Sequence, residues 1–316
     1  MALLIITTTN RGPEFIEGAR AAGHGLDIRI WPEIGNREDI RYALAWLPPK
    51  GVLKTLPNLE LIVSVGAGVD HLLGDPELPD VPVVRYVDPD LTGRMAEYIA
   101  LQVLFHQRRM TEYQALQEQR KWGYVPEPAA HEVRVGVMGL GVMGQAALAV
   151  LQPFGYQLRG WSRTPHTIPG VACFAGGGGL DAFLEETDIL ACVLPQTPQT
   201  RAIIDGRLLA KLSRRGRHER MPGPVLINAG RGGLQVEADI VAALNDGTLY
   251  AASLDVFEVE PLPHASPLWS HPRVVITPHN AAESTARAIT RYFIRQIRAH
   301  QKGDRLENVV DRARGY

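Results

Sequence analysis

Short apolar runs alternate with segments of helical apolar spacing along the chain up to about residue 90. Strands and amphipathic helices that alternate in this way are typical of βαβ units, which build a parallel sheet. The pattern predicts strands over residues 3–8, 26–31, 42–46, 61–65 and 83–87.

One long helix is predicted next, over residues 92 to about 119. Its segment MAEYIALQVLFHQRRMTEYQALQEQ keeps apolar residues at helical spacing and contains neither glycine nor proline. The loop that follows, WGYVPEPAAHE, contains two prolines and therefore marks a boundary.

A second series of apolar runs begins at residue 133 and predicts six further strands. A helix between two of them is predicted over residues 236–246, and Gly247 ends it. The glycine run 176–179 is predicted to form a local turn, and a last helix is predicted from residue 281 to about 302. The six strands cover residues 133–138, 157–161, 189–194, 225–228, 251–255 and 274–277.

The two series predict an α/β protein with two doubly wound parallel-sheet domains. A Rossmann-type dinucleotide-binding domain, residues 100–280, would be inserted into a flavodoxin-like domain made of residues 1–99 and 281–316. The first domain would bind the substrate, and a cleft between the two lobes is the expected place for it.

The composition of the chain mainly indicates which partners and which kinds of site are not expected. The 316 residues are 45% hydrophobic and 21% charged, and a net charge of −1 gives no reason to expect a nucleic-acid or membrane partner. Cys173 and Cys192 are the only cysteines, too few for a disulfide framework or a metal-ligand cluster, so we expect no metal. The first residues lack a signal-peptide pattern, and no apolar run reaches about 18 residues, so we expect a cytoplasmic protein. The basic segment 213–224 is expected to be a solvated surface loop.

The most specific motif is GLGVMG at residues 139–144, directly after an apolar run and before a helical pattern. In this context a GxGxxG motif predicts dinucleotide binding. Gly139 would allow a tight turn, Gly141 would let the backbone approach a pyrophosphate, and Gly144 would let the helix pack closely on the strand. The helix N-terminus offers free N–H groups to the phosphates.

The end of the second strand of this domain indicates which dinucleotide binds. A site that prefers NAD usually carries an acidic residue there, for the ribose 2′-hydroxyl. Here Ser162, Arg163 and Thr164 stand in its place. An arginine grips a 2′-phosphate bidentately, and the hydroxyls can hydrogen-bond it, so we expect NADPH to be preferred, with NADH possible.

Three residues follow strands of the second series and form the candidate catalytic set. Arg231 follows INAG, Glu260 follows LDVFEV and His279 follows VVITP. Taken singly, each is more simply a surface arginine, a loop acid or a structural histidine. Together they suit reduction of a 2-keto acid: a guanidinium binds the carboxylate, a histidine delivers a proton near neutral pH, and an acid orients that histidine.

Five motifs of the chain resemble the D-isomer-specific 2-hydroxyacid dehydrogenase family. The pattern comprises GLGVMG (139–144), LPQTPQTRAII (194–204), INAGRGG (227–233), LDVFEVEPLP (254–263) and TPHNAA (277–282), and it spans essentially the whole chain. The resemblance implies that Arg231 binds substrate, Glu260 orients His279, and His279 is the acid/base. Cofactor contacts would come from Gly139, Gly141, Val142, Met143, Gly144, Ser162, Arg163, Thr164, Leu194, Pro195, Thr200, Ala229, Gly230 and Asp255.

The first domain should contribute the loop SVGAGVDHL, at residues 64–72. Its backbone N–H groups at Gly66, Ala67, Gly68 and Val69 would converge on the substrate carboxylate. Trp46, at the end of an earlier strand, would line the cleft.

Within the family, WSRT, ALAWLPP and SVGAGVDHL look like the glyoxylate/hydroxypyruvate reductase branch. That implies reduction of glyoxylate to glycolate or hydroxypyruvate to D-glycerate by a homodimer. In that dimer the region 105–130 would form an arm, with Trp122 as an interface anchor.

Two departures from the family pattern bear on substrate identity. Glu260 and His279 are only 19 residues apart, a shorter step than in many relatives, and the basic insertion 213–224 replaces a short connection. One alternative is therefore a reductase of bulkier 2-keto acids, and another is a dehydrogenase of a phosphorylated hydroxy acid. A third, from a different class, is a dinucleotide-sensing regulatory protein on the same scaffold.

Overall fold

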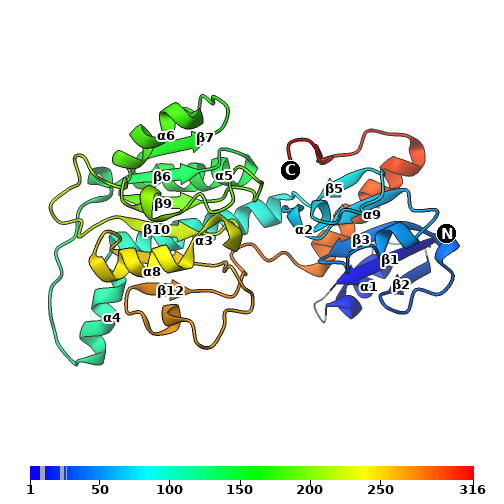
Figure 1. The fold of residues 1–316 in the computed structure, drawn as a ribbon, viewed down its shortest axis with the longest axis horizontal. Coiled ribbons are helices and arrows are strands. Elements are labelled where there is room, and N and C mark those ends of the chain that lie inside the picture. The colour runs from blue at the N-terminus through cyan, green and yellow to red at the C-terminus, as the bar shows by residue number, and fades with distance from the viewer. Residues whose placement is uncertain (8–10, 22–24, 26) are drawn as a thin grey trace. The chain divides into compact units, whose positions relative to one another are not determined.

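The computed structural model describes residues 1–7, 11–21, 25 and 27–316. The chain forms two compact units, one made of Met1–Leu91 with Ser284–Tyr316 and the other of Thr92–Glu283 (Figure 1). The sequence placed the corresponding boundaries at residues 100 and 280. No helix in the described ranges is long and apolar enough to cross a membrane.

The first unit is built on a five-stranded parallel sheet in the order β2-β1-β3-β4-β5. The five predicted strands are present with ends shifted by one or two residues, although predicted positions 8 and 26 lie outside the described residues. The central strands are buried along their length, as expected for a sheet covered on both faces. The strands are β1 (Ala2–Thr7), β2 (Asp27–Ile30), β3 (Ile40–Trp46), β4 (Leu61–Ser64) and β5 (Val83–Arg85).

Two helices from opposite ends of the chain pack together in this unit. Helix α1 spans Gly12–Ala21, and helix α9 spans Ala286–Lys302. Their approach is close, because a Cβ on Gly18 would lie 2.7 Å from Thr290 Oγ1. The sequence predicted a start at residue 281 for the last helix, but Thr285 caps it by accepting a 3.2 Å bond from the Ala288 amide. The unit also contains α2 (Asp70–Leu73), η1 (Arg37–Asp39) and η2 (Leu53–Thr55).

The second unit is built on a seven-stranded parallel sheet in the order β12-β11-β10-β9-β6-β7-β8. The order reverses between β6 and β9, and this switch point is where doubly wound sheets bind nucleotides. The two-domain parallel α/β architecture predicted from the sequence is therefore confirmed. The strands are β6 (Arg134–Met138), β7 (Gln157–Ser162), β8 (Ala172–Ala175), β9 (Ile189–Cys192), β10 (Val225–Asn228), β11 (Ala251–Leu254) and β12 (Val274–Ile276).

One strand and one helix were missed. Strand β8, of sequence ACFA, pairs with β7, and the glycine run 176–179 is the first turn of α6 (Gly176–Glu185) rather than an isolated turn. Glycine is a poor helix former, so propensity alone argued against a helix here. The apolar end of this helix decides otherwise, since Phe183 and Leu184 are buried in the core.

The prediction of one long helix over residues 92–119 is wrong in one respect. The segment forms two helices, α3 (Pro89–Gln107) and α4 (Met110–Glu118). Arg109 at the break has a left-handed backbone, with φ of 57°. Its guanidinium bonds Glu112 at 2.5 Å, the Pro126 carbonyl at 3.2 Å and the Tyr250 hydroxyl at 3.5 Å. The pair with Glu112 is local, but the contacts with Pro126 and Tyr250 come from distant parts of the chain, which the local sequence does not reveal.

Side chains that alternate along the strands form the core on the two faces of this sheet. Val135, Val137 and Ile227 pack on one face with α3 and with α5 (Val142–Leu151). Leu190 and Leu226 pack on the other face with α6, α7 (Gly206–Leu209) and α8 (Glu237–Asp246). Helix α8 ends at Gly247, as predicted. Short 3₁₀ helices complete the unit: η3 (Ala130–Glu132), η4 (Gln152–Phe154), η5 (Gly232–Leu234) and η6 (Pro267–Ser270).

The basic segment 213–224 is less solvated than the sequence suggested. Met221 and Ser213 are buried within it. The buried Arg134 pairs with Asp188 at 2.5 Å and also bonds the Arg215 carbonyl. Ser213 donates a 2.6 Å bond to the same aspartate, so the start of the loop is tied to the domain.

Candidate active site

The glycine-rich turn between β6 and α5 lies at the switch point of the second sheet. Gly139 has φ of 106°, a conformation that favours glycine. A Cβ on Gly144 would lie 1.8 Å from the Gly139 carbonyl oxygen, so helix and strand pack there without a side chain between them. Gly141 precedes the helix, and a Cβ built on it would meet no atom within 4 Å. The three glycines therefore have the geometry that a phosphate-binding turn requires.

Ser162 ends β7, and its side chain orders the residues that follow. Its hydroxyl donates a 2.7 Å hydrogen bond to the Thr164 carbonyl and lies 2.9 Å from His166 Nδ1. Arg163 and Thr164 are exposed on this turn. His166 was not among the residues predicted from the sequence. Only its position two residues after Thr164 could have indicated it.

Two further turns border the same edge of the sheet. Thr200 bonds the Pro195 carbonyl at 2.7 Å and accepts from the Thr197 amide at 2.8 Å, which closes the turn after β9. After β10, a Cβ on Gly230 would lie 2.9 Å from the Leu194 carbonyl oxygen. The predicted cofactor residues of these two turns therefore lie side by side.

Glu260 and His279 form the central pair of the candidate site. Glu260 Oε2 lies 2.7 Å from His279 Nδ1, and Glu260 Oε1 accepts a 2.9 Å bond from the Phe257 amide. Both side chains are about one third exposed, at 35% and 33%. One ring nitrogen of His279 is thus held by a carboxylate, which orients the ring.

The electrostatics of Glu260 favour its ionised form. Partial burial opposes ionisation, but the hydrogen bonds from His279 and from the Phe257 amide outweigh it. The positive charge of Arg231 acts in the same direction, and together these effects hold the pKa of Glu260 below its ordinary value. Arg231 is therefore close enough to act on the pair. Arg231 directly precedes η5, and its guanidinium donates a 2.9 Å bond to the Gly230 carbonyl.

His279 has a left-handed backbone with φ of 54°, which is unusual for a residue other than glycine. Its amide donates to the Asp255 carbonyl at 2.8 Å and to the Thr277 carbonyl at 3.1 Å. Strained backbone persists only where its surroundings hold it, and such positions concentrate at functional sites.

The side chain of Asp255 helps to hold the backbone around His279 through hydrogen bonds. It is 1% exposed and accepts hydrogen bonds from the Thr277 hydroxyl, the Asn280 amide and the Ala281 amide. Tyr98 lies 2.9 Å from the same threonine hydroxyl, and burial raises the pKa of Tyr98, so this phenol stays protonated. Asp255, predicted from the sequence as a cofactor contact, thus also holds the segment that carries His279.

The residues predicted in the first unit also lie together. A Cβ on Gly66 would lie 2.8 Å from Trp46 Cζ3, so the indole packs directly on this glycine. The Gly66 amide donates to Ser64 Oγ at 3.3 Å, and that hydroxyl bonds the Gly68 carbonyl at 3.2 Å. Neither glycine has a positive φ. Gly66 is thus needed for the approach of Trp46, a reason different from the one the sequence suggested.

The residues described contain no group of three or more His, Cys, Asp or Glu arranged to hold a metal ion. A guanidinium, a carboxylate and an imidazole follow the carboxyl ends of β10, β11 and β12. With a dinucleotide turn after β6 on the same sheet edge, they define the class of the protein as a dinucleotide-dependent oxidoreductase.

Comparison with known proteins makes the class more specific. The family model "D-isomer specific 2-hydroxyacid dehydrogenase, NAD binding domain" matches residues 100–281. The chain is 43% identical to the NADPH-dependent glyoxylate/hydroxypyruvate reductase of Sinorhizobium meliloti, solved with NADP and sulfate, with a TM-score of 0.92 over 100% of both chains.

Two other solved structures are similar over the whole chain. A D-isomer specific 2-hydroxyacid dehydrogenase from Xanthobacter autotrophicus Py2, solved with NADPH and MES, is 40% identical with a TM-score of 0.93. A probable 2-hydroxyacid dehydrogenase from Rhizobium etli CFN 42, solved with NADP, HEPES and L(+)-tartaric acid, is 44% identical with a TM-score of 0.92. Each match covers 100% of this chain and 99% of the other. The chain belongs to the D-isomer specific 2-hydroxyacid dehydrogenase family and is an enzyme of that class.

Proposed function

We propose that the protein reduces a small 2-keto acid with NADPH, converting glyoxylate to glycolate or hydroxypyruvate to D-glycerate. The observation that carries the proposal is the 2.7 Å contact between Glu260 and His279 beside the charge of Arg231. The similarity to the S. meliloti reductase supports this choice of substrates.

NADPH fits the residues that would hold it. The open face of Gly141 at the start of α5 would receive the pyrophosphate, as argued for the turn above. Arg163, with Ser162 and Thr164, would bind the 2′-phosphate, which no carboxylate at this strand end repels. When bound, NADPH supplies the hydride for the reduction. NADH would lack the contact with Arg163 and is expected to serve less well.

The substrate carboxylate is the natural ligand of Arg231, because a planar guanidinium matches two carboxylate oxygens. The backbone of residues 66–69 in the first unit is our second candidate for this carboxylate. Trp46 packs on Gly66 and is therefore part of the same local structure.

His279 carries the proton. Reduction of a keto acid to a hydroxy acid takes up one hydride at the carbonyl carbon and one proton at its oxygen. With Nδ1 held by Glu260, the imidazolium donates its Nε2 proton to the developing alkoxide and becomes neutral. Glu260 stabilises the charged ring before transfer, and solvent restores the proton afterwards.

The test follows NADPH absorbance with a panel of glyoxylate, hydroxypyruvate, pyruvate and a bulkier 2-keto acid, each also with NADH. We expect kcat/KM to be highest for glyoxylate or hydroxypyruvate with NADPH. His279→Gln should lower kcat about 100-fold or more while NADPH binding survives. Turnover near the wild-type rate in that variant, or no oxidation of NADPH with any keto acid, would contradict the proposal.

We further propose that the protein is a homodimer through the arm of residues 105–130. Within this arm Trp122 and Tyr124 are strongly exposed, at 106% and 78%. Exposed large aromatic side chains are typical of an interface in the assembled protein. Light scattering of the wild type should give twice the chain mass, and Trp122→Ser with Tyr124→Ser should shift the mass toward a monomer. A wild-type monomer at micromolar concentration would contradict this.

A further inference from the structure

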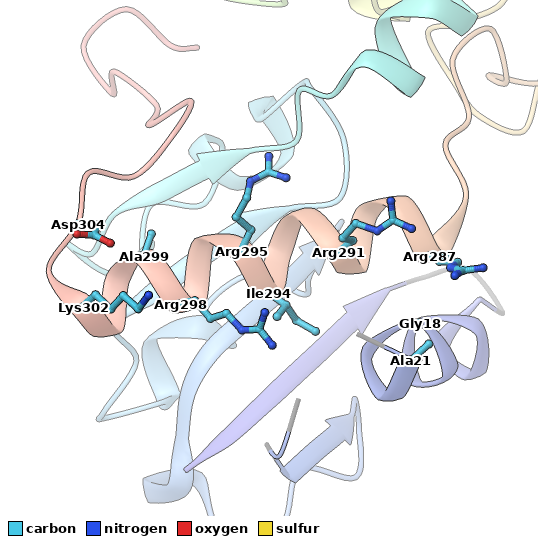
Figure 2. Close-up of a pocket in the computed structure, with 10 residues that line it drawn as sticks. All are labelled: Gly18, Ala21, Arg287, Arg291, Ile294, Arg295, Arg298, Ala299, Lys302 and Asp304. Atoms are coloured by element: carbon cyan, nitrogen blue, oxygen red, sulfur yellow. The ribbon is translucent and has the colours of Figure 1, made fainter. Parts of the chain in front are cut away.

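A groove of about 530 Å³ in the first unit lies along helix α9, next to α1 (Figure 2). Helix α9 contributes a single row of cations to its lining, and each of them is exposed. Successive members are three or four residues apart, so their Cα atoms follow one side of the helix over about 22 Å, while the side chains of Arg295 and Arg298 diverge from it. The row consists of Arg287, Arg291, Arg295, Arg298 and Lys302.

This row is unusual for a solvated helix face. Such faces usually mix both signs of charge, because like charges at i, i+4 destabilise a helix. Helix α9 contains no Asp or Glu at all, in a chain whose net charge is −1. The row therefore concentrates positive charge locally, at a cost that an anionic ligand would relieve.

Acidic side chains of the protein pair with only some of the cations in this row. Arg295 pairs with Glu307 at 2.9 Å and lies over the Tyr292 ring, with 4.9 Å between its guanidinium carbon and the ring centroid. For Arg287 and Arg291, the described part of the chain provides no ion-pair partner. Asp304 is the one acidic residue among those that line the groove.

The shape of the groove is set by the close packing of the two helices. Gly18 and Ala21 of α1 line it without large side chains. Gly18 cannot be larger, because its Cβ would lie 2.7 Å from the buried Thr290. In the view of Figure 2, Arg298 and Ile294 extend from α9 on the side where α1 lies, whereas Arg295 extends on the opposite side. A preformed groove of this volume is in the range of small-molecule sites, about 300–1,000 Å³.

We propose that this groove binds a small polyphosphorylated anion with two or three linked phosphoryl groups. Four of the five cations are arginines, whose planar fork binds phosphate oxygens bidentately. A row of positive charges binds a ligand with several linked negative charges better than it binds a ligand with one carboxylate. A net charge of −1 disfavours a nucleic acid, whose binding relies on an extended basic surface.

The proposal does not depend on the reaction proposed above. All residues of the groove belong to the first unit, and none belongs to the set of Arg231, Glu260 and His279. Its test measures binding of inorganic tripolyphosphate and not turnover, so either proposal can fail without the other.

The experiment is calorimetric titration of tripolyphosphate into protein saturated with NADPH, which fills the other phosphate site. The groove variant is Arg287→Ala with Arg291→Ala, since alanine keeps the helix stable. The matched control is Arg37→Ala with Arg305→Ala, two exposed arginines of the same unit that do not line the groove. The circular dichroism spectrum and the melting temperature should match the wild type in both variants, which shows that they are folded.

We expect the groove variant to weaken tripolyphosphate binding at least tenfold and the control variant less than twofold. Arg287→Lys with Arg291→Lys should give an intermediate loss, because charge remains while the fork is lost. Raising the salt concentration should weaken wild-type binding more than binding to the groove variant. An equal loss in groove and control variants, or no wild-type binding at all, would overturn the proposal. Tighter binding of a single-stranded oligonucleotide or of polyglutamate through the same arginines would overturn it as well.

Discussion

The side chain of Asp255 holds the backbone of Asn280, with a hydrogen bond of 2.9 Å from the Asn280 amide to Asp255 Oδ1. Asn280 follows His279 directly, so a buried carboxylate at the end of one strand fixes the proposed acid/base histidine at the end of the next. The left-handed φ of His279 is sustained in this way.

Asp255→Asn should therefore loosen the segment of residues 277–281. Loss of the charge and of an acceptor from three buried hydrogen bonds should cost about 2 kcal/mol of unfolding free energy. We also expect kcat to fall about tenfold or more because His279 is no longer held. Denaturant unfolding and NADPH oxidation measure the two effects. Asp80→Asn, at an exposed aspartate, is the control, and equal behaviour of the two variants would refute this role for Asp255.

Gly141 and Gly144 provide a matched pair for the dinucleotide turn. Gly144→Ala places a Cβ 1.8 Å from a backbone oxygen and should lower the unfolding free energy by about 3 kcal/mol or more. Gly141→Ala meets no atom within 4 Å, so stability should change by less than about 0.5 kcal/mol. That variant should nevertheless bind NADPH about tenfold more weakly, since the methyl group occupies the approach of the phosphates. Wild-type NADPH affinity in Gly141→Ala would show that the turn does not hold the cofactor.

Arg163 should determine the preference for NADPH. Arg163→Asp replaces a bidentate phosphate ligand with a repelling carboxylate, so KM for NADPH should rise at least about tenfold, with a much smaller change for NADH. Steady-state kinetics with both cofactors measure the ratio, and Arg305→Asp is an exposed control. The assignment of Arg163 fails if the two KM values change by the same factor.

The pair of Glu260 and His279 should make stability depend on pH in acid. The native pKa of Glu260 is lowered, so its contribution is complete above the ordinary glutamate pKa of about 4.3. It is lost as the pH falls through the lower native value. Melting temperatures of wild type and Glu260→Gln should therefore converge as the pH decreases below about 4, and kcat of the variant should be about 10- to 100-fold lower near neutrality. A constant difference in melting temperature across this range would contradict the assigned interaction.

His106 is a second source of acid sensitivity, and it lies in the core. Burial lowers its pKa to about 4, and it is hydrogen-bonded to Ser253 at 2.7 Å. The unfolded chain takes up this proton near pH 6.5, so stability is complete above that pH. It should decline by about 3 kcal/mol as the pH falls from 6.5 to 4. His106→Gln, which can keep a hydrogen bond to Ser253, should remove this part of the decline in urea unfolding, and an unchanged pH profile would refute it.

Much of the fold follows from local pattern. Periodicity and length separate strands from helices, so the first five strands and six of the seven in the second sheet were predicted near their observed places. The exceptions have a common cause. Arg109 breaks a helix while its guanidinium contacts Pro126 and Tyr250, and α6 forms despite its glycines because Phe183 is buried. Both depend on residues that meet only in the folded chain.

For the site, local motifs were enough to propose the chemistry: glycines at a strand-to-helix turn, and an arginine, a glutamate and a histidine after successive strands. Parallel strands bring their carboxyl ends to one edge, so this proximity follows from topology alone. Tertiary structure alone decided that Asp255 holds His279, that Trp46 packs on Gly66, and that a row of cations borders a groove beside α1. The physical reason is that hydrogen bonds, close approaches and grooves depend on distances between distant segments, which periodicity along one segment does not encode.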